Sequence, residues 1–301
     1  MAGVAGADLT NAVSQAGGFG ILGGGYGDKK FFEQQLSQVN RDLPFGVGFI
    51  TWRLQDNPNI LDLALDAQPK AILLSFGELQ PYVKKIKDHG VLLLAQCQTV
   101  SDAEHAAALG ADAIIAQGTE AGGHGSVRAT MSLLPAVVDS LPNHPVIGAG
   151  GIADGRGLAA CFNLGAIGVM MGSRFYAAQE SLAAEAAKLR AVAAIGDNTT
   201  RSSVFDVLRN FDWPKPYNLR TLKNTLSDQY EANIPALLND KAAAQAKFNQ
   251  ACDDGDFDQA PVIIGEAVDL IHDIPTAAQI VRRVSSEAEQ VIRTTHELLQ
   301  S

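Results

Sequence analysis

The feature that most constrains the fold is a repeat in the first 176 residues, in which short apolar runs alternate with amphipathic stretches. The apolar runs lack polar alternation, so they fit strands that are buried on both faces of a parallel sheet. Seven strands are predicted, at residues 19–24, 45–51, 71–76, 91–97, 113–118, 146–151 and 168–175. The repeat length of roughly 20–30 residues is that of a β-α unit, which predicts an α/β fold.

Signals for helix ends lie between these runs. The expected helix starts are Asp8, Asp28, Ser101 and Asp154, and the closing glycines are Gly90, Gly110 and Gly165. Other glycines gather at the C-terminal ends of strands, where (β/α)8 barrels keep their active sites. A TIM-barrel-like fold is therefore favoured over a doubly wound open sheet. With seven strands visible, the first of the eight is expected to be absent or shortened.

The pattern changes after residue 176. Residues 181–196 and 274–300 predict helices, whereas residues 208–224, "LRNFDWPKPYNLRTLKN", show no clear period. We therefore expect a barrel over residues 1–178 and a mostly helical C-terminal cap, packed on the barrel, over residues 179–301. The apolar C-terminal helix leaves two arrangements open, packing within the chain or in a homodimer.

Composition excludes several classes of protein. The 301 residues carry a formal net charge of −10, which argues against nucleic acid or an anionic membrane as the main partner. The three cysteines form no CxxC pair, as is typical of a reducing cytoplasm, and no apolar run is long enough to span a bilayer. No cluster of His, Cys and carboxylate residues has metal-ligand spacing, so no metal is expected.

Two glycine-rich loops predict a phosphate site. One strand ends at Gly150 and Gly151, and the next ends at Gly172 and Ser173. In a barrel the two loops would converge, and their main-chain N–H groups could approach a phosphate closely. The glycine-rich residues 20–27 match a dinucleotide fingerprint poorly and are interpreted as a turn.

The stretch "QGTEAGGH", residues 117–124, follows a predicted buried strand. The Gln117 amide could bond the edge of a heteroaromatic ring, while Gly122 and Gly123 would leave room for a flat ligand. His124 is expected at the rim of this pocket, where an imidazole can move a proton near neutral pH.

These residues resemble the nitronate monooxygenases, formerly called 2-nitropropane dioxygenases, which are FMN-dependent TIM barrels. "QGTEAGGH" is the most specific element, supported by "GAGGIADGRG" and "MGSRF" and by the first 25 residues. The resemblance implies that His124 is catalytic and that FMN is bound by Met1, Ala2, Gly48, Gln117, Gly122, Gly150, Gly151, Met170, Met171, Gly172 and Ser173. Two departures stand out: relatives usually carry a strand before the matching Met-Ala-Gly, and many have asparagine where Gly48 stands.

The resemblance implies oxidation of alkyl nitronates, and of nitroalkanes, with O2 to a carbonyl compound and nitrite. An NAD(P)H-dependent flavin reductase acting on an enoyl thioester or a quinone is the nearest alternative, because it would share the FMN site. A non-catalytic flavin-binding protein and a flavin-free barrel for sugar phosphates are further alternatives. Phe211, Trp213 and Tyr217 predict either a lid over the pocket or a structural core.

Overall fold

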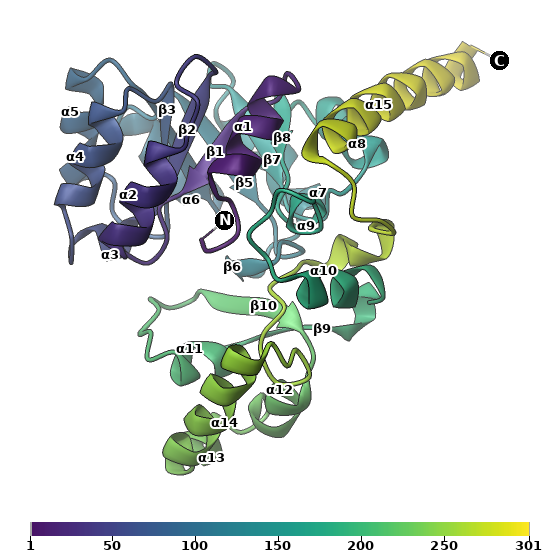
Figure 1. Ribbon diagram of the computed structural model, residues 1–301. Helices are drawn as coiled ribbons and strands as arrows, with labels where there is room; N and C mark the ends of the chain where they lie inside the picture. Colours follow the sequence, from purple (N-terminus) through teal and green to yellow (C-terminus); the bar gives the residue numbers. More distant parts are fainter. Residues whose placement is uncertain (1, 301) are drawn as a thin grey trace.

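The computed structural model describes residues 2–300, and its main feature is a parallel sheet of seven strands (Figure 1). In spatial order these are β1 (Gly20–Gly23), β2 (Phe45–Ile50), β3 (Ala71–Ser75), β4 (Leu92–Cys97), β5 (Ala113–Gln117), β7 (Val146–Ala149) and β8 (Gly168–Met170). All seven predicted strands are confirmed. The last is shorter than expected, because the chain turns after Met170 into a short helix, α9 (Ser173–Tyr176).

Successive side chains along each strand point to opposite faces of the sheet, so the core has two parts, one on each face. Ile72 and Leu74 face the layer between the sheet and its helices, whereas Leu73 and Ile115 belong to the cluster on the other face. All four side chains are at least 98% buried. Each such side chain contributes about 1.5–3 kcal/mol when it leaves water. Burial on both faces explains why these strands appear in the sequence as continuous apolar runs.

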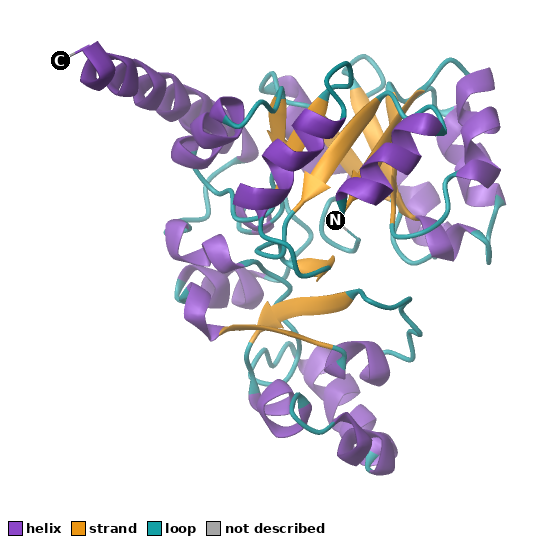
Figure 2. Cartoon of the chain, turned by 180° about the vertical axis from the view of Figure 1, so that it is seen from behind, coloured by secondary structure: helices purple, strands orange, loops and turns teal. Residues whose placement is uncertain are grey.

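Helices cover the outer face of the sheet (Figure 2). They are α1 (Ala7–Gln15), α2 (Lys29–Ser37), α3 (Thr51–Leu54), α4 (Asn59–Asp66), α5 (Gln80–Asp88), α6 (Val100–Ala108), α7 (Thr130–Ser140) and α8 (Gly155–Asn163). Gly90, Gly110 and Gly165 follow helix ends with positive φ, as predicted.

The predicted N-caps are confirmed at two positions and wrong at two. Asp28 accepts from the N–H of Phe31, and Asp154 accepts from the first turn of α8. Asp8 instead lies inside the first turn of α1, where a carboxylate favours the positive end of the helix dipole. Ser101 is also inside its helix, because Thr99 caps α6 by accepting from the Asp102 N–H.

The sheet curls into a half-barrel and has two free edges. β1 and β8 are its terminal strands, and within residues 2–300 neither pairs with a strand on its outer side. The expectation of a TIM-barrel-like fold with one strand fewer than eight is confirmed.

The C-terminal region is mostly helical but also contains a small sheet. Its helices are α10 (Glu185–Val192), α11 (Val204–Leu208), α12 (Thr225–Tyr230), α13 (Ile234–Asn239), α14 (Lys241–Asp254) and α15 (Ala277–Gln300), with 3-10 turns η1 (Gly196–Asn198) and η2 (Glu266–Leu270). An antiparallel sheet joins β6 (Gly123–Gly125), from the barrel loop, to β10 (Asn218–Leu222) and then to β9 (Thr199–Ser202). The sequence did not predict this sheet, which lies between barrel and cap (Figure 1).

Candidate active site

His124 lies where the barrel meets the cap. It is the central residue of β6, a few residues beyond the C-terminal end of β5, and it pairs with Leu219 of β10. The residue is 6% exposed. The structure therefore places His124 in the interior between the two regions, and its place at the rim of a ligand pocket stays a prediction.

The imidazole of His124 contacts a buried carboxylate from the cap. Both carboxylate oxygens of Asp206, on α11, lie 3.0 Å from Nε2 of His124. Arg209 donates to the same carboxylate at 2.8 Å. Asp206 is 3% exposed, so this histidine, carboxylate and guanidinium form a polar network almost sealed from water.

Aromatic rings surround the imidazole. The Trp213 indole stacks on it, with centroids 3.3 Å apart and planes 10° apart, and Phe76 meets it edge-on at 6.3 Å. The rings in contact around this point, here called the aromatic cluster, are Tyr26, Trp52, Phe76, Phe211, Trp213 and Tyr217. Its members come from barrel loops and from the cap segment between α11 and β10, so the cluster joins the two regions.

Burial sets the protonation of His124. It lowers the pKa of the imidazole, while the hydrogen bond and charge of Asp206 act in the opposite direction. Arg209 and Arg201 add to the lowering through their positive charges. The net direction is downward, so the neutral ring that can accept a proton is favoured near neutral pH.

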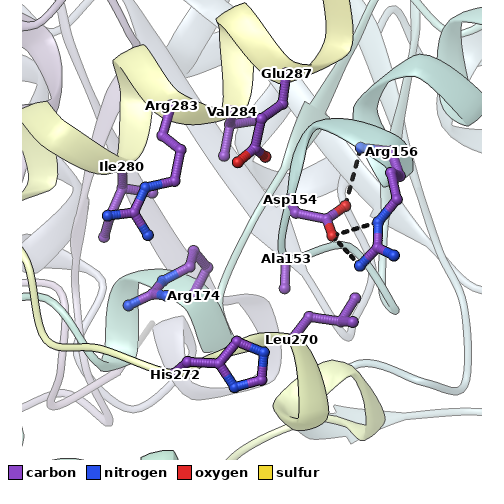
Figure 3. Close-up of a pocket in the computed structure, with 10 residues that line it drawn as sticks. All are labelled: Ala153, Asp154, Arg156, Arg174, Leu270, His272, Ile280, Arg283, Val284 and Glu287. Atoms are coloured by element: carbon purple, nitrogen blue, oxygen red, sulfur yellow. Dashed lines mark hydrogen bonds and ion pairs between the residues drawn. The ribbon is translucent and has the colours of Figure 1, made fainter. Parts of the chain in front are cut away.

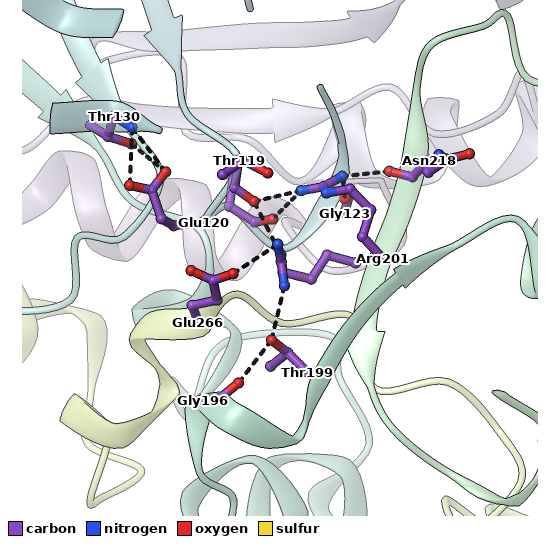
Figure 4. Close-up of polar contacts among 11 residues, drawn as sticks. Thr119, Glu120, Gly123, Thr130, Gly196, Thr199, Arg201, Asn218 and Glu266 are labelled. Atoms are coloured by element: carbon purple, nitrogen blue, oxygen red, sulfur yellow. Dashed lines mark hydrogen bonds and ion pairs between the residues drawn. The ribbon is translucent and has the colours of Figure 1, made fainter. Parts of the chain in front are cut away.

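Two arginines of the cap sheet hold the loop before His124 (Figure 4). Arg201, on β9, donates to the main-chain oxygens of Thr119, Ala121 and Gly123. Arg220, on β10, donates to Thr119 as well and forms an ion pair with Glu266 at 2.8 Å. Because the guanidinium groups fix the carbonyl directions, they also fix the path of the loop that carries His124.

A glycine is required at position 122 because the main chain at residues 264–265 passes very close to it. A Cβ built on Gly122 would lie 2.4 Å from the main-chain carbon of Ile264 and 2.6 Å from the nitrogen of Gly265. A Cβ on Gly265 would lie 2.4 Å from the Glu120 oxygen. Two backbones thus touch at a pair of glycines. The absence of a side chain at Gly122 serves this crossing, and its contact with a flavin stays a prediction.

Three buried glutamines meet at the ends of β4 and β5. Gln96 and Gln98 donate from their side-chain nitrogens to Oε1 of Gln117, at 3.1 and 2.7 Å. With its oxygen engaged twice, Gln117 keeps its two N–H groups, which bond no residue in the described range 2–300. These donors fit the acceptor edge of a heteroaromatic ring.

The two glycine-rich loops lie at the ends of neighbouring strands, β7 and β8. Gly150 and Gly151 have φ of +96° and +72°, conformations that glycine adopts without strain. A Cβ on Gly172 would meet nothing within 4 Å. The main-chain N–H groups of Gly151, Gly172 and Ser173 make no hydrogen bond to residues 2–300, so they remain as donors for an anion such as phosphate.

The remaining predicted cofactor residues occupy varied places. Met1 lies outside the described residues, and Ala2 is half-buried beside the N-terminal loop. The carbonyl of Gly48, in β2, accepts from Gly24 at 2.8 Å. Met170 lines the inner face of the half-barrel, and Met171 packs among the surrounding helices.

A separate cavity of about 180 Å³ lies where α15 packs on the N-terminus of α8 (Figure 3). Its arginines are already paired: Arg156 with Asp154, and both Arg174 and Arg283 with Asp273. Glu287 accepts a hydrogen bond from the main-chain N–H of Gly155 at 3.0 Å. Arg174 belongs to the "MGSRF" stretch, and its bonds to the chain at Asp273 hold the turn after β8. We interpret this cavity as structural.

Comparison with known proteins agrees with this geometry. The nitronate monooxygenase family model matches residues 50–287. The chain belongs to the nitronate monooxygenase family. It is 31% identical to the nitronate monooxygenase of Neurospora crassa, over 96% of this chain and 88% of that one. Membership makes the chain a flavin oxidoreductase, as expected.

Three further proteins are similar to this chain. FabK from Thermotoga maritima superposes with a TM-score of 0.86 at 28% identity, covering 99% of this chain and 93% of FabK. A carboxyl-CoA dehydrogenase acting on a methyl-oxo-octahydroindene in Rhodococcus jostii is 37% identical over 67% of this chain and 58% of its own length. A nitroalkane oxidase from Streptomyces ansochromogenes, at 24% identity and a TM-score of 0.83, shares the fold.

Several residues that build the site were not found from the sequence. Asp206, Arg201 and Arg220 come from short cap elements far along the chain from the loop they contact, and no local pattern marks them. Gln96 lies near the end of β4 and Gln98 directly follows it, where polar residues after an apolar run could have been noticed. Within the described range 2–300 no helix is long and apolar enough to cross a membrane, and no three ligand side chains gather as a metal site.

Proposed function

We propose that this chain binds FMN and oxidises alkyl nitronates, and nitroalkanes, with O2 to a carbonyl compound and nitrite. The observation that carries the proposal is the buried His124–Asp206 pair, placed beyond the end of β5 in a chain of the nitronate monooxygenase family. The nitronate relatives and the FabK fold support a flavin at the C-terminal ends of the strands.

The residues present fit FMN. The free N–H groups of Gln117 suit the acceptor edge of the isoalloxazine ring. Those of Gly151, Gly172 and Ser173 suit its phosphate. When bound, FMN supplies a two-electron acceptor that the side chains lack.

The chain's own residues bind and orient the substrate. Arg201 and Arg209 offset the negative charge of Asp206 near His124, which reduces the repulsion of a small anion such as a nitronate. The aromatic cluster excludes water from the imidazole. His124 is the group that contacts the substrate, and Asp206 holds it.

The test starts from the absorbance spectrum of the purified protein. An alkyl nitronate added without oxygen is expected to bleach the flavin bands, and with oxygen it is expected to give nitrite and consume O2. His124→Asn should keep the flavin and lose most of its turnover of a neutral nitroalkane, by about 10²-fold or more. A protein without flavin bands, or one whose bands ignore nitronate, would exclude the proposal.

The second candidate is reduction or dehydrogenation of a CoA thioester. It is supported by the FabK superposition and by the CoA-thioester dehydrogenase relative from Rhodococcus. In this case NADH without oxygen should bleach the flavin, and an enoyl thioester should restore the bands. The same sample, divided between nitronate and NADH, separates the two candidates.

A further inference from the structure

The contact between Asp206 and His124 fixes which ring nitrogen carries the proton. A carboxylate that is ion-paired with Arg209 can only accept hydrogen bonds, so the proton of the neutral imidazole must be on Nε2, facing Asp206. The other nitrogen, Nδ1, then carries the lone pair. Nδ1 makes no hydrogen bond to any residue in the range 2–300.

We propose that Asp206 is a positioning residue that holds His124 in the tautomer with a free Nδ1, and that Nδ1 is the base that takes a proton from a neutral nitroalkane. This proposal rests on the function proposed above and adds the role of Asp206 and the identity of the basic atom. Asp206 contacts the imidazole and does not itself touch the substrate.

The proton transfer balances without an oxidant. The bond between the hydrogen and the carbon next to the nitro group breaks, and a bond from that hydrogen to Nδ1 forms. The electron pair stays on the substrate, which becomes the nitronate anion. The imidazole becomes a cation, and Asp206 stabilises it at 3.0 Å. A nitronate supplied directly needs no such step.

The surroundings of His124 determine what the loss of the carboxylate does. The charged groups that act on the ring are Asp206 and Arg209 from the α11 region and Arg201 from β9. The rings that pack on it, Phe76 and Trp213, are uncharged. Without the Asp206 charge, burial and two positive charges act unopposed, so the pKa of His124 should fall further.

The first test is independent of activity. Nitrogen-15 NMR of the holoprotein with labelled histidine separates the two neutral tautomers, and His124→Asn identifies the His124 signals. The wild type should show the Nε2–H form. Asp206→Asn should add the Nδ1–H form and shift the His124 titration to lower pH. An Nδ1–H form in the wild type would overturn the proposal, even if the variant does not fold.

The second test compares two substrates at one site. In Asp206→Asn the ratio of nitroalkane to nitronate kcat/KM should fall by about tenfold or more, because only the nitroalkane needs the base. The acid limb of the nitroalkane pH profile should move to lower pH, since the pKa of His124 is lower. Asp206→Glu should recover part of the ratio.

Asp240→Asn is the matched control. It replaces a carboxylate with an amide elsewhere in the cap, at a side chain that accepts a hydrogen bond from the Tyr230 hydroxyl. The ratio of nitroalkane to nitronate kcat/KM should be unchanged in this variant. An equal loss on both substrates in Asp206→Asn, with no shift of the acid limb, would show a structural role only.

Failure of this proposal and failure of the proposed function give different results. If the wild type oxidises nitronate but not nitroalkane, the nitronate-oxidising function stands and the assignment of Nδ1 as a base is refuted. If the wild type oxidises neither substrate, the proposed function and the assignment of Nδ1 as a base are both refuted, whichever tautomer NMR reports.

Discussion

Gly122→Ala is expected to destabilise the protein through a single added methyl group. The new Cβ would lie 2.4 Å and 2.6 Å from main-chain atoms of Ile264 and Gly265. Both neighbours are backbone, which cannot move aside as a flexible side chain does. Gly122 has no positive φ, so the collision alone sets the effect. Forcing a group into a filled space costs about 1–3 kcal/mol.

The assay is thermal unfolding of purified variants side by side. For a chain of this length 1 kcal/mol corresponds to about 2 °C in Tm, so Gly122→Ala should melt roughly 2–6 °C below the wild type. Gly168→Ala is the matched control, because its Cβ would meet nothing within 4 Å. This control should melt at or slightly above the wild-type temperature, since alanine restricts the unfolded chain. A Gly122→Ala variant as stable as Gly168→Ala would refute the argument for a tight crossing.

Three further predictions concern other contacts. Arg201→Met removes donors from at least three main-chain oxygens and should lower the free energy of unfolding by about 3 kcal/mol or more, measured in urea; an unaffected midpoint would contradict a holding role. Trp213→Ala tests lid against core: a folded, flavin-containing variant with raised KM supports the lid, and a Tm lowered by roughly 6 °C or more supports the core. Burial raises the pKa of Cys97 to about 12 and that of Cys161 to about 11, so at pH 8 both stay protonated and a thiol reagent should label only the exposed Cys252 until the protein is unfolded. Rapid labelling of all three in the native protein would show that the core opens.

The barrel could be predicted from the sequence because each strand carries its own signal. The run 71–74 is apolar throughout since both of its faces are buried, and this property needs no knowledge of its partners. The glycines that close helices are equally local, because a positive φ depends on the residue itself.

The contacts that organise His124 could not be predicted in this way. β6 is only three residues long, and it forms a strand because β10, far along the chain, pairs with it. Asp206 stands 82 residues from His124, in a short helix whose sequence gives no sign of the pairing. The glycines of residues 117–124 correctly marked an unusual loop, but the crossing at Ile264 and Gly265 became visible only in three dimensions.

The sheet of β6, β10 and β9 limits how chimaeras of such proteins can be designed. His124 and its strand β6 belong to the barrel in sequence, yet the partner strand β10, the carboxylate partner and the arginines that hold the loop belong to the cap. A chimaera that joins this barrel to the cap of a relative would therefore inherit a histidine without its support. A chimaera of two family members should acquire a new substrate range only when the loop at 118–125 and the cap that binds it are taken from the same protein.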